Sequence, residues 1–589
     1  MSGIRLFRTK SLITLSLLLV ILTGAACSTS ATAPPQPTSS SNEGEEGEGP
    51  VPTASPALTA AAPAQVTLDR VIVAMTTQGI DSNLSYAGGV SQLDKRPALE
   101  FLIGVDRNTG AYIPQLAEAW KMSPDGKTWT LDLREGVHFH DGWGELTARD
   151  VRHSVFLQVF PDTQSGSVGR WRSLAGIGQT DTEEEMLKRL EEVVEIVDDH
   201  RVVLHLETVE PELFYDLSEN DNLVMDSKAR WDAGGEELYQ QKVVGTGPLQ
   251  FVERTEGVGV RYQSMEDHWR QTPEYRELEF RWVAESATRL ATLLAGEVQV
   301  SDVERALQAQ AIGQGMKVIR SKLPSFNVRY YFGGLYWTTP DKLDPNVPFL
   351  KKEVREAMNI ALNREAIANT ILGGEVTLAT APPFHPDLDE GLNPGVWNPN
   401  WDRRYEELYA YNPTRARELL AQAGYPDGFE FTMWPDNQPG LSEAVDIAQA
   451  MALDWEAIGL KPEVVATERA QISPAARSME MQGKLWYSYT RRRAAPEIIR
   501  SSTGSTTSHF YDHPWTDGKI AELGHTVDPA KRAQLLQEIG DHYMEEFAVI
   551  PMFWFFSEIA VDPEYIADYE FPGTAAGFFT HLEYIKAAR

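Results

Sequence analysis

The sequence reads IPQLAEAW at residues 113–120, SPDGKTWTLDLREGVHFHDG at 123–142 and LTARDV at 146–151. Residues 129–133 alternate apolar with polar side chains, which is typical of a strand with one buried face. Pro124-Asp125-Gly126 predicts a turn just before that strand, because proline presets φ and glycine accepts a positive φ. Thr147 and Asp150 form a capping-box pattern, which predicts the start of a helix. Strand, turn and helix in this order indicate a mixed α/β fold.

Similar patterns continue along the chain. Further strands are expected at 70–75, 201–206, 278–283 and 327–332, and the apolar run 549–556 predicts a buried strand. The periodicity predicts helices over 182–195 and 352–372, and the first of these has a glutamate-rich face that suits solvent. Asn412-Pro413 and Gly424 predict the two ends of another helix.

Four more motifs follow in order, GTGPL (245–249), RLATLLAGEV (289–298), VREAMNIALNREAI (354–367) and ARELLAQAGYPDGF (416–429). Together with the first three stretches, they resemble the sequence pattern of the family 5 extracellular solute-binding proteins, the peptide/nickel-type receptors of ABC importers. The motifs describe turns and helix faces, so they identify a scaffold without naming a ligand.

The resemblance implies a two-lobed periplasmic-binding-protein-like fold (type II, cluster C-like) with mixed sheets and an extra subdomain. Lobe 1 would combine one subdomain of residues 66–110, 245–325 and 550–589 with a second of residues 111–244, and lobe 2 would span 326–549. Hinge strands are expected near 328–332 and 549–553. The implied protein is a monomeric receptor that captures a small organic solute, an oligopeptide by family, between its lobes. It would deliver that solute to a permease and its ATPase subunit, without a cofactor and without catalysis.

Composition excludes several other classes. The chain has 589 residues with 53 Lys and Arg against 85 Asp and Glu, so its formal net charge is −32. Such an acidic chain is a poor nucleic-acid binder, because that affinity comes mainly from cations on phosphates. The chain contains one cysteine, which excludes an internal disulfide and a multi-cysteine zinc site.

The N-terminus resembles a secretion signal followed by a lipid anchor. A basic start precedes an apolar stretch over residues 11–22, which is the form of a signal peptide of residues 1–26. Cys27 follows small residues and resembles a bacterial lipobox cysteine, which would carry palmitate, although Gly24 stands where leucine is usual. The alternative is a plain signal peptide with an incidental cysteine. Residues 27–65 are rich in Ser, Pro, Gly and Glu, which predicts a tether at the cell membrane, in the periplasm or on its outer face.

The sequence departs from the family at the expected ligand site. Peptide-binding members carry a W-x-x-D segment whose aspartate pairs with the peptide's α-ammonium. If Trp486 matches that tryptophan, Tyr489 takes the aspartate's place. Arg491, Arg492 and Arg493 follow, and they suit a carboxylate or phosphate. The alternative is that they lie on the surface beside structural carboxylates. Aromatic side chains suit an enclosing cleft, and the candidates are Tyr86, Trp434, Trp486, Tyr487 and Tyr489.

Other chemistry has weak signals. His138 and His140, and His509 and His513, are spaced as metal ligands sometimes are, but both pairs lie in turn or loop contexts, so no metal site is predicted. The sequence contains no HExxH, GxSxG or GxxxxGK[ST] motif. Three alternatives remain open: a secreted polymer hydrolase, a receptor for a non-peptide anionic ligand held by the arginines, and a receptor that feeds a sensor.

Overall fold

The computed structural model describes residues 68–76, 81–87, 92–219, 221–374, 376–387, 395–436, 441–490, 509–573 and 580–588. Cys27, the predicted signal and tether segments and Arg491, Arg492 and Arg493 lie outside these residues. Of Tyr487 and Tyr489 the structure describes the backbone alone. No helix among the described residues is long and apolar enough to cross a bilayer.

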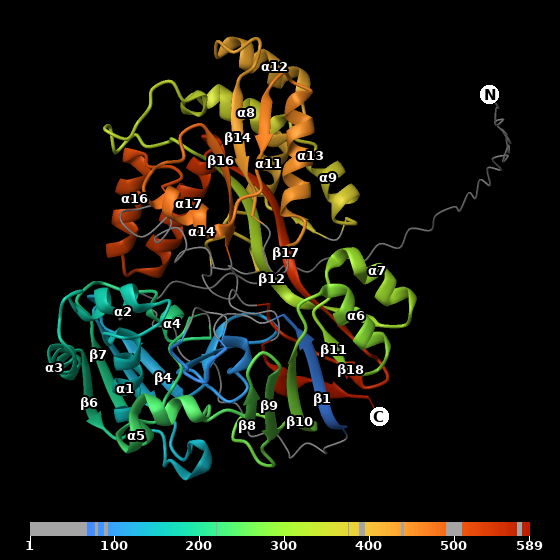
Figure 1. Cartoon of the computed structure of the whole chain (residues 1–589). Coiled ribbons are helices and arrows are strands. Elements are labelled where there is room, and N and C mark those ends of the chain that lie inside the picture. The colour runs from blue at the N-terminus through green and yellow to red at the C-terminus, as the bar shows by residue number, and fades with distance from the viewer. Residues whose placement is uncertain are drawn as a thin grey trace, which may run out of the picture. The chain divides into compact units, whose positions relative to one another are not determined.

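One long mixed sheet runs through the folded body (Figure 1). Its strand order is β15, β14, β16, β12, β17, β11, β1, β10, β9, β8, with β13 also paired to β17. The strands are β1 (Leu68–Met75), β8 (Leu249–Thr255), β9 (Gly259–Ser264), β10 (Tyr275–Trp282), β11 (Val300–Ser301), β12 (Lys317–Phe332), β13 (Thr377–Leu378), β14 (Glu430–Trp434), β15 (Lys461–Val464), β16 (Lys484–Thr490) and β17 (Val549–Val561). The predicted strands at 70–75, 278–283, 327–332 and 549–556 are therefore confirmed within this sheet.

The buried apolar residues form several separate cores. One core contains residues between Phe326 and Phe555, and we call the part built around it lobe 2. Two large cores and a small one contain residues from the remaining chain, and we call the part built around them lobe 1. β12 and β17 pair along most of their length and pass from one lobe to the other. The boundaries expected from the resemblance stay a prediction.

Lobe 2 is a sheet covered by helices (Figure 1). The helices are α8 (Lys352–Ile360), α9 (Arg364–Ile371), α11 (Trp401–Tyr409), α12 (Pro413–Gln422), α13 (Ala444–Glu456), α14 (Arg469–Arg477), α16 (Pro514–His525) and α17 (Pro529–Glu545). The prediction of one helix over 352–372 is wrong, because the chain breaks between α8 and α9. Asn363 causes the break: its side chain caps α9 by accepting from the N–H of Ala366, and its own N–H donates to Asp454 of α13 at 2.8 Å.

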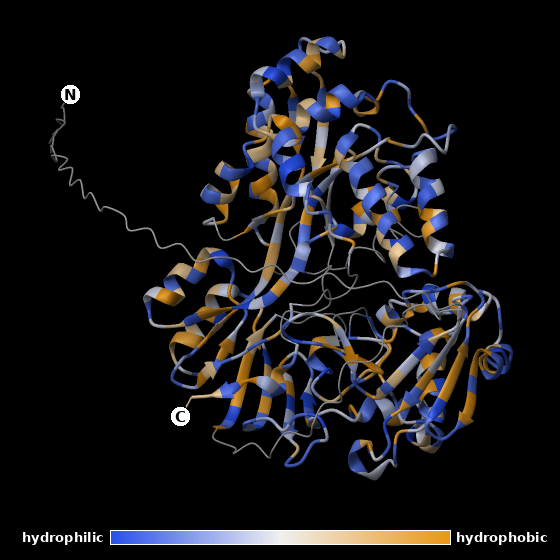
Figure 2. Ribbon diagram, turned by 180° about the vertical axis from the view of Figure 1, so that it is seen from behind, coloured by the Kyte–Doolittle hydropathy of each residue, from blue (hydrophilic) through white to orange (hydrophobic). Residues whose placement is uncertain are grey.

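Lobe 1 contains a second, antiparallel sheet in the order β4, β5, β7, β6. The remaining elements are β2 (Ile103–Val105), β3 (Tyr112–Pro114), β4 (Ala117–Met122), β5 (Thr128–Leu133), α1 (Ala148–Val159), α2 (Val168–Ala175), α3 (Glu183–Val193), β6 (Val194–Asp198), β7 (Arg201–His205), α4 (Leu213–Asp216), α5 (Lys228–Gln241), α6 (Ser286–Leu294), α7 (Arg305–Gly313), β18 (Ile566–Asp568) and β19 (Lys586–Ala587). Hydrophobic residues are frequent along these strands (Figure 2).

Two local predictions for lobe 1 meet different outcomes. The capping box of Thr147 and Asp150 is confirmed at the start of α1. The helix predicted over 182–195 ends two residues early, because Val194 begins β6 and pairs with Leu204 of β7. Branched side chains at the end of the run favour that pairing.

The GTGPL motif marks a close crossing of two segments in lobe 1. A Cβ atom at Gly245 would lie 2.0 Å from the carbonyl oxygen of Ala98, and one at Gly247 would lie 2.8 Å from the carbonyl carbon of Ala98. Glycine is required here because any side chain would displace the neighbouring backbone.

Candidate functional site

The two strands that join the lobes are interrupted where they pass between them. The β12–β17 register shifts between Arg320 and Pro324, between Pro324 and Phe326, and between Val328 and Arg329. Serines fill the gap: the Ser325 and Ser557 hydroxyl oxygens lie 2.6 Å apart, and the Ser557 N–H donates to Ser321 Oγ at 3.0 Å. Ordinary ladder bonds are thus replaced by side-chain bonds at one level of both strands, which makes this level the place where the connection bends.

A row of polar side chains follows on β12 in lobe 2. Asn327, Arg329 and Tyr331 alternate along the strand and therefore share one face. Arg329 donates to Asn327 Oδ1 at 2.5 Å and to the Tyr331 hydroxyl at 2.7 Å, and all three side chains are buried. The Nδ2 of Asn327 has no hydrogen-bond partner among the residues that the structure describes. A buried amide with spare donors beside a guanidinium can receive a carbonyl or carboxylate oxygen.

The structure brings two of the predicted aromatic residues together. Trp434 of β14 and Trp486 of β16 are register partners in a parallel pair. Trp486 is buried at 2% exposure, and its ring meets the edge of Tyr331 with centroids 4.7 Å apart. Trp434 is half-buried, and the Lys484 ammonium lies 4.8 Å from its ring centroid. These residues continue the polar row of β12 across the sheet.

The other predicted site residues are dispersed or undescribed. Tyr86 lies in a lobe 1 core, where its hydroxyl donates to Glu236 at 2.7 Å. The backbones of Tyr487 and Tyr489 pair with Tyr330 and Val328 of β12. A role in ligand binding stays a prediction for every one of these residues, and for the three arginines.

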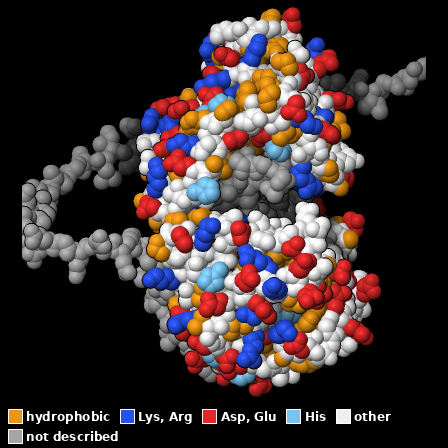
Figure 3. All heavy atoms as spheres, turned by 90° about the vertical axis from the view of Figure 1, so that its left-hand side faces the viewer, with side chains coloured by type: hydrophobic (Ala, Val, Ile, Leu, Met, Phe, Trp, Pro, Cys, Tyr) orange, Lys and Arg blue, Asp and Glu red, His pale blue; other side chains and the backbone are white. Residues whose placement is uncertain are grey.

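The surface is hollowed between the two lobes (Figure 3). Acidic and basic side chains are mixed on both lobes around this hollow. A binding protein with a mobile connection uses such a space to enclose its ligand from both sides.

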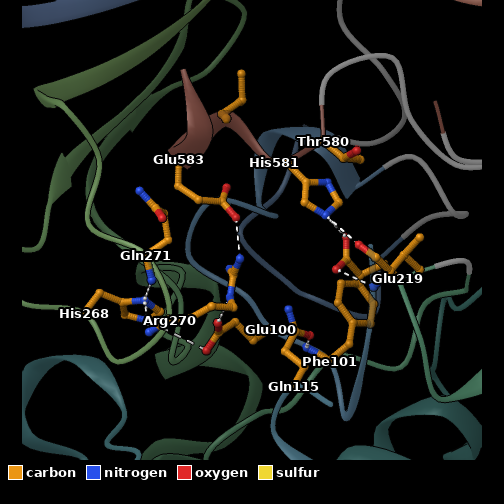
Figure 4. Close-up of polar contacts among 12 residues, drawn as sticks. Glu100, Phe101, Gln115, Glu219, His268, Arg270, Gln271, Thr580, His581 and Glu583 are labelled. Carbon is orange, nitrogen blue, oxygen red and sulfur yellow. Dashed lines mark hydrogen bonds and ion pairs between the residues drawn. The ribbon is translucent and has the colours of Figure 1, made fainter. Parts of the chain in front are cut away.

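A separate small pocket in lobe 1 is surrounded by buried charges (Figure 4). Arg270 donates from Nε to Glu100 at 2.9 Å and from Nη1 to Glu583 at 2.6 Å. Glu100 also accepts from the Thr246 hydroxyl at 2.9 Å and from the Trp269 indole at 3.1 Å. Burial would raise the pKa of Glu583, but the Arg270 guanidinium holds that pKa below its usual range. This network links the C-terminal segment to the rest of lobe 1.

The rest of this pocket has unused hydrogen-bonding capacity. Arg96 donates from Nη2 to the Glu219 carbonyl oxygen at 2.9 Å. Among the described residues, no hydrogen-bond partner is found for its Nε and Nη1, the Thr580 hydroxyl or the Nδ1 of His581. The lining residues come from five separate stretches of the sequence. No local sequence motif identifies these lining residues as a group, so the sequence analysis did not predict this pocket.

The histidine pairs are not arranged as metal sites. His140 is buried with Nε2 2.8 Å from the Gly247 carbonyl oxygen, whereas His138 is exposed. His509 Nδ1 lies 2.7 Å from an Asp512 carboxylate oxygen. Within the described residues, no group of three or more His, Cys, Asp or Glu side chains is placed to hold a metal ion.

Two separately packed lobes, joined by a bent pair of strands and with a hollow between them, are the architecture of a binding protein. Residues 111–519 match the family model described as bacterial extracellular solute-binding proteins, family 5 middle. The chain belongs to this family, and its function is that of a solute-binding receptor of an ABC importer. The proteins of known function that it resembles are binding proteins rather than enzymes.

Curated relatives cover most of the chain. It is 26% identical to the dipeptide-binding protein of Escherichia coli over 474 residues, which cover 78% of this chain and 84% of that protein. It is 27% identical to the glutathione-binding protein GsiB of Salmonella typhi over 487 residues, 79% of this chain and 84% of that one. Among solved structures, the ABC transporter substrate-binding protein CtaP of Listeria monocytogenes matches with a TM-score of 0.71 at 18% identity, covering 88% of this chain and 99% of that chain. The two-lobed fold is therefore confirmed.

Proposed function

We propose that this protein encloses a small organic solute, an oligopeptide by family, in the hollow between lobes 1 and 2 and passes it unchanged to a permease and its ATPase. The observation that carries the proposal is that β12 and β17 run from a core of lobe 1 into the core of lobe 2, with an interrupted ladder at Ser321 and Ser325. Relatives named for dipeptides and for glutathione support a peptide or a peptide-like solute.

We further propose that the anionic end of the solute is the end that this receptor recognises. The segment after Trp486 carries Tyr489 in place of the family's aspartate and then three arginines. β16 ends at Thr490, which pairs with Asn327 of the polar row, and Arg491 is the next residue in the sequence. Guanidinium groups bind carboxylates in bidentate fashion, whereas a solute ammonium would lack its usual counter-charge.

The receptor would act outside the cytoplasm, held at the membrane by a lipid on Cys27. The basic start, the apolar stretch and the following cysteine support this location. A long polar tether would let the folded body reach its permease while anchored.

Thermal unfolding with matched peptides tests the proposal. The purified protein is melted with a tetrapeptide, its N-acetylated form and its C-amidated form. A ligand at 100 times its Kd stabilises the folded state by about 2.7 kcal/mol, which raises the melting temperature. The free and N-acetylated peptides should both raise it, and the amidated peptide should not. Stabilisation that requires a free ammonium would overturn the proposed end preference.

The fate of the solute separates a receptor from a hydrolase. Mass spectrometry of the bound and released peptide should return it intact and in a 1:1 ratio with the protein. Progressive cleavage of the peptide, lost when one carboxylate is replaced, would mean that the chain is an enzyme.

A further inference from the structure

A buried ion pair joins the two lobes away from the connecting strands. Arg532 lies near the start of α17 in lobe 2, and Glu212 is the N-cap residue of α4 in lobe 1. Arg532 Nη2 and Glu212 Oε1 are 2.5 Å apart, and 320 residues separate them along the chain. The two side chains are 7% and 8% exposed. Figure 1 shows α16 and α17 facing α2 and α4 on the side opposite α6 and α7.

Other contacts hold Arg532 in place. Its Nη1 donates to the carbonyl oxygens of Leu523 at 2.8 Å and Thr526 at 3.0 Å, at the C-terminal end of α16. The guanidinium is therefore fixed by its own lobe, at the helix end where a cation is favoured.

Lobe 1 positions Glu212 in a similar way. The backbone N–H of Glu212 donates to Glu210 Oε1 at 3.1 Å. Glu210 and Asp216 in turn form ion pairs with Arg170, the second of them at 3.0 Å. Because Arg170 is engaged by these two carboxylates, the Glu212 side chain is left for Arg532.

Apolar side chains from both lobes also meet at Gly126. Gly126 adopts φ +70°, and a Cβ atom there would lie 2.9 Å from Val209 Cγ1 and 2.9 Å from Val527 Cγ2. Val209 precedes Glu212 in lobe 1, and Val527 precedes Arg532 in lobe 2. The turn of the SPDG motif in lobe 1 thus packs against Val527 of lobe 2, which lies near Arg532 in the sequence.

A second inter-lobe pair lies next to the connection. Arg305 of α7 contacts Glu443, the N-cap residue of α13, at 3.4 Å, and it also contacts Glu558 of β17 at 3.0 Å. A contact beside the bend moves little when two lobes separate, whereas a contact on the far side must break. The two pairs therefore differ in what lobe opening does to them.

We propose that Glu212 and Arg532 form a latch that closes the two lobes and sets how much of the protein is closed before solute arrives. The proposal rests on the proposed function. A ligand that binds the closed form has an apparent affinity scaled by the closed fraction, so the latch would set affinity without touching the solute. Opening returns both charges to water, which offsets part of the attraction.

Spin-label distances test the latch directly. The full chain carries Cys27→Ser, with labels at Leu187→Cys on α3 and Leu453→Cys on α13, two exposed positions on opposite lobes. Glu212→Gln keeps the side-chain shape and removes its charge. We expect it to shift the distance distribution toward longer, open distances and to lower the closed-to-open ratio by about tenfold. Glu207→Gln is the matched control, because its exposed pair with Arg189 lies within lobe 1.

Two outcomes would overturn the proposal. One is a Glu212→Gln distribution identical to that of the parent, and the other is a parent that is already open without solute. Arg532→Lys keeps the charge and should retain part of the closed population, while far-ultraviolet circular dichroism verifies that each variant is folded. The distances are measured without solute, so a failure of peptide binding would contradict the proposed function and leave the latch result intact.

Discussion

Arg270 Nη1 lies 2.6 Å from Glu583 Oε1, although 313 residues separate them along the chain. Both side chains are buried, and Arg270 also binds Glu100. Removing the Arg270 guanidinium would leave the carboxylates of Glu100 and Glu583 buried without this counter-charge. We predict that Arg270→Met lowers the free energy of unfolding by about 3–5 kcal/mol, measured by urea unfolding. Arg276→Met, at an exposed pair with Asp69, should change it by less than about 1 kcal/mol. Equal losses from both variants would contradict this role.

Asp226 should make stability depend on pH. Its Oδ2 accepts from Ser85 Oγ at 2.7 Å, and burial raises the pKa of Asp226 to about 7. An unfolded aspartate titrates near a pKa of about 3.9, so between about pH 4 and 7 the folded state binds more protons and stability falls as pH rises. Across this pH window, Asp226 lowers the free energy of unfolding by about 4 kcal/mol.

The variant Asp226→Asn tests that contribution. It should remove most of the decline in unfolding free energy between pH 4 and 8, measured by urea unfolding at several pH values. Asp232→Asn, at an exposed pair in α5, is the control and should follow the parent. A parent-like slope for Asp226→Asn would show that another group is responsible.

Gly540 should tolerate no side chain. A Cβ atom there would lie 2.5 Å from Trp401 Cζ2 and 3.0 Å from Phe384 Cε2. We predict that Gly540→Ala lowers the unfolding free energy by about 1–3 kcal/mol through overpacking. Gly518→Ala, on α16 with nothing within 4 Å of the added atom, should be neutral or stabilising by up to about 1 kcal/mol. Thermal unfolding compares the two, and the reverse order would refute the packing argument.

The three arginines after β16 should affect an anionic solute. Once such a solute is found, at least one of Arg491→Ala, Arg492→Ala and Arg493→Ala should raise its Kd tenfold or more, because a bidentate contact is lost. Arg477→Ala, at an exposed position on α14, is the control in calorimetric titrations. Parent-like affinity in all three variants would assign these arginines to the surface.

Cys27 should determine whether the protein is found in the membrane fraction or in the soluble fraction. We predict that Cys27→Ser moves the chain from the membrane fraction to the soluble extracytoplasmic fraction, detected by immunoblotting of fractions. Ser28→Ala should leave the distribution unchanged. Membrane retention of Cys27→Ser would mean that the cysteine is incidental.

The fold was predictable where signals are local. The turn at Pro124, the cap at Thr147 and the buried strand at Val549 each depend on neighbouring residues, and all three appear in the structure. The break at Asn363 was not predictable, because Asp454 fixes it from another helix. Likewise, β6 begins at Val194 because β7 offers a partner there.

Less of the candidate site could be predicted. Trp434 and Trp486 are candidates because aromatic side chains suit an enclosing cleft, and the sheet does bring them together. The sequence did not identify Asn327 and Arg329 as site residues, because alternation on a strand does not reveal which of its faces receives a ligand. The sequence did not predict the pairing of Glu212 with Arg532 either, because no local pattern links residues so far apart in the chain.

The path of the chain through β12 and β17 has a consequence for biosynthesis. The polypeptide leaves lobe 1 along β12, builds all of lobe 2 and returns along β17, so lobe 2 is in effect an insertion within lobe 1. β11 lacks its neighbour β17, and Arg270 lacks Glu583, until the final tenth of the chain has been exported. Lobe 1 must therefore complete its folding last. Secreted chains truncated near the C-terminus should contain a folded lobe 2 and an incompletely folded lobe 1.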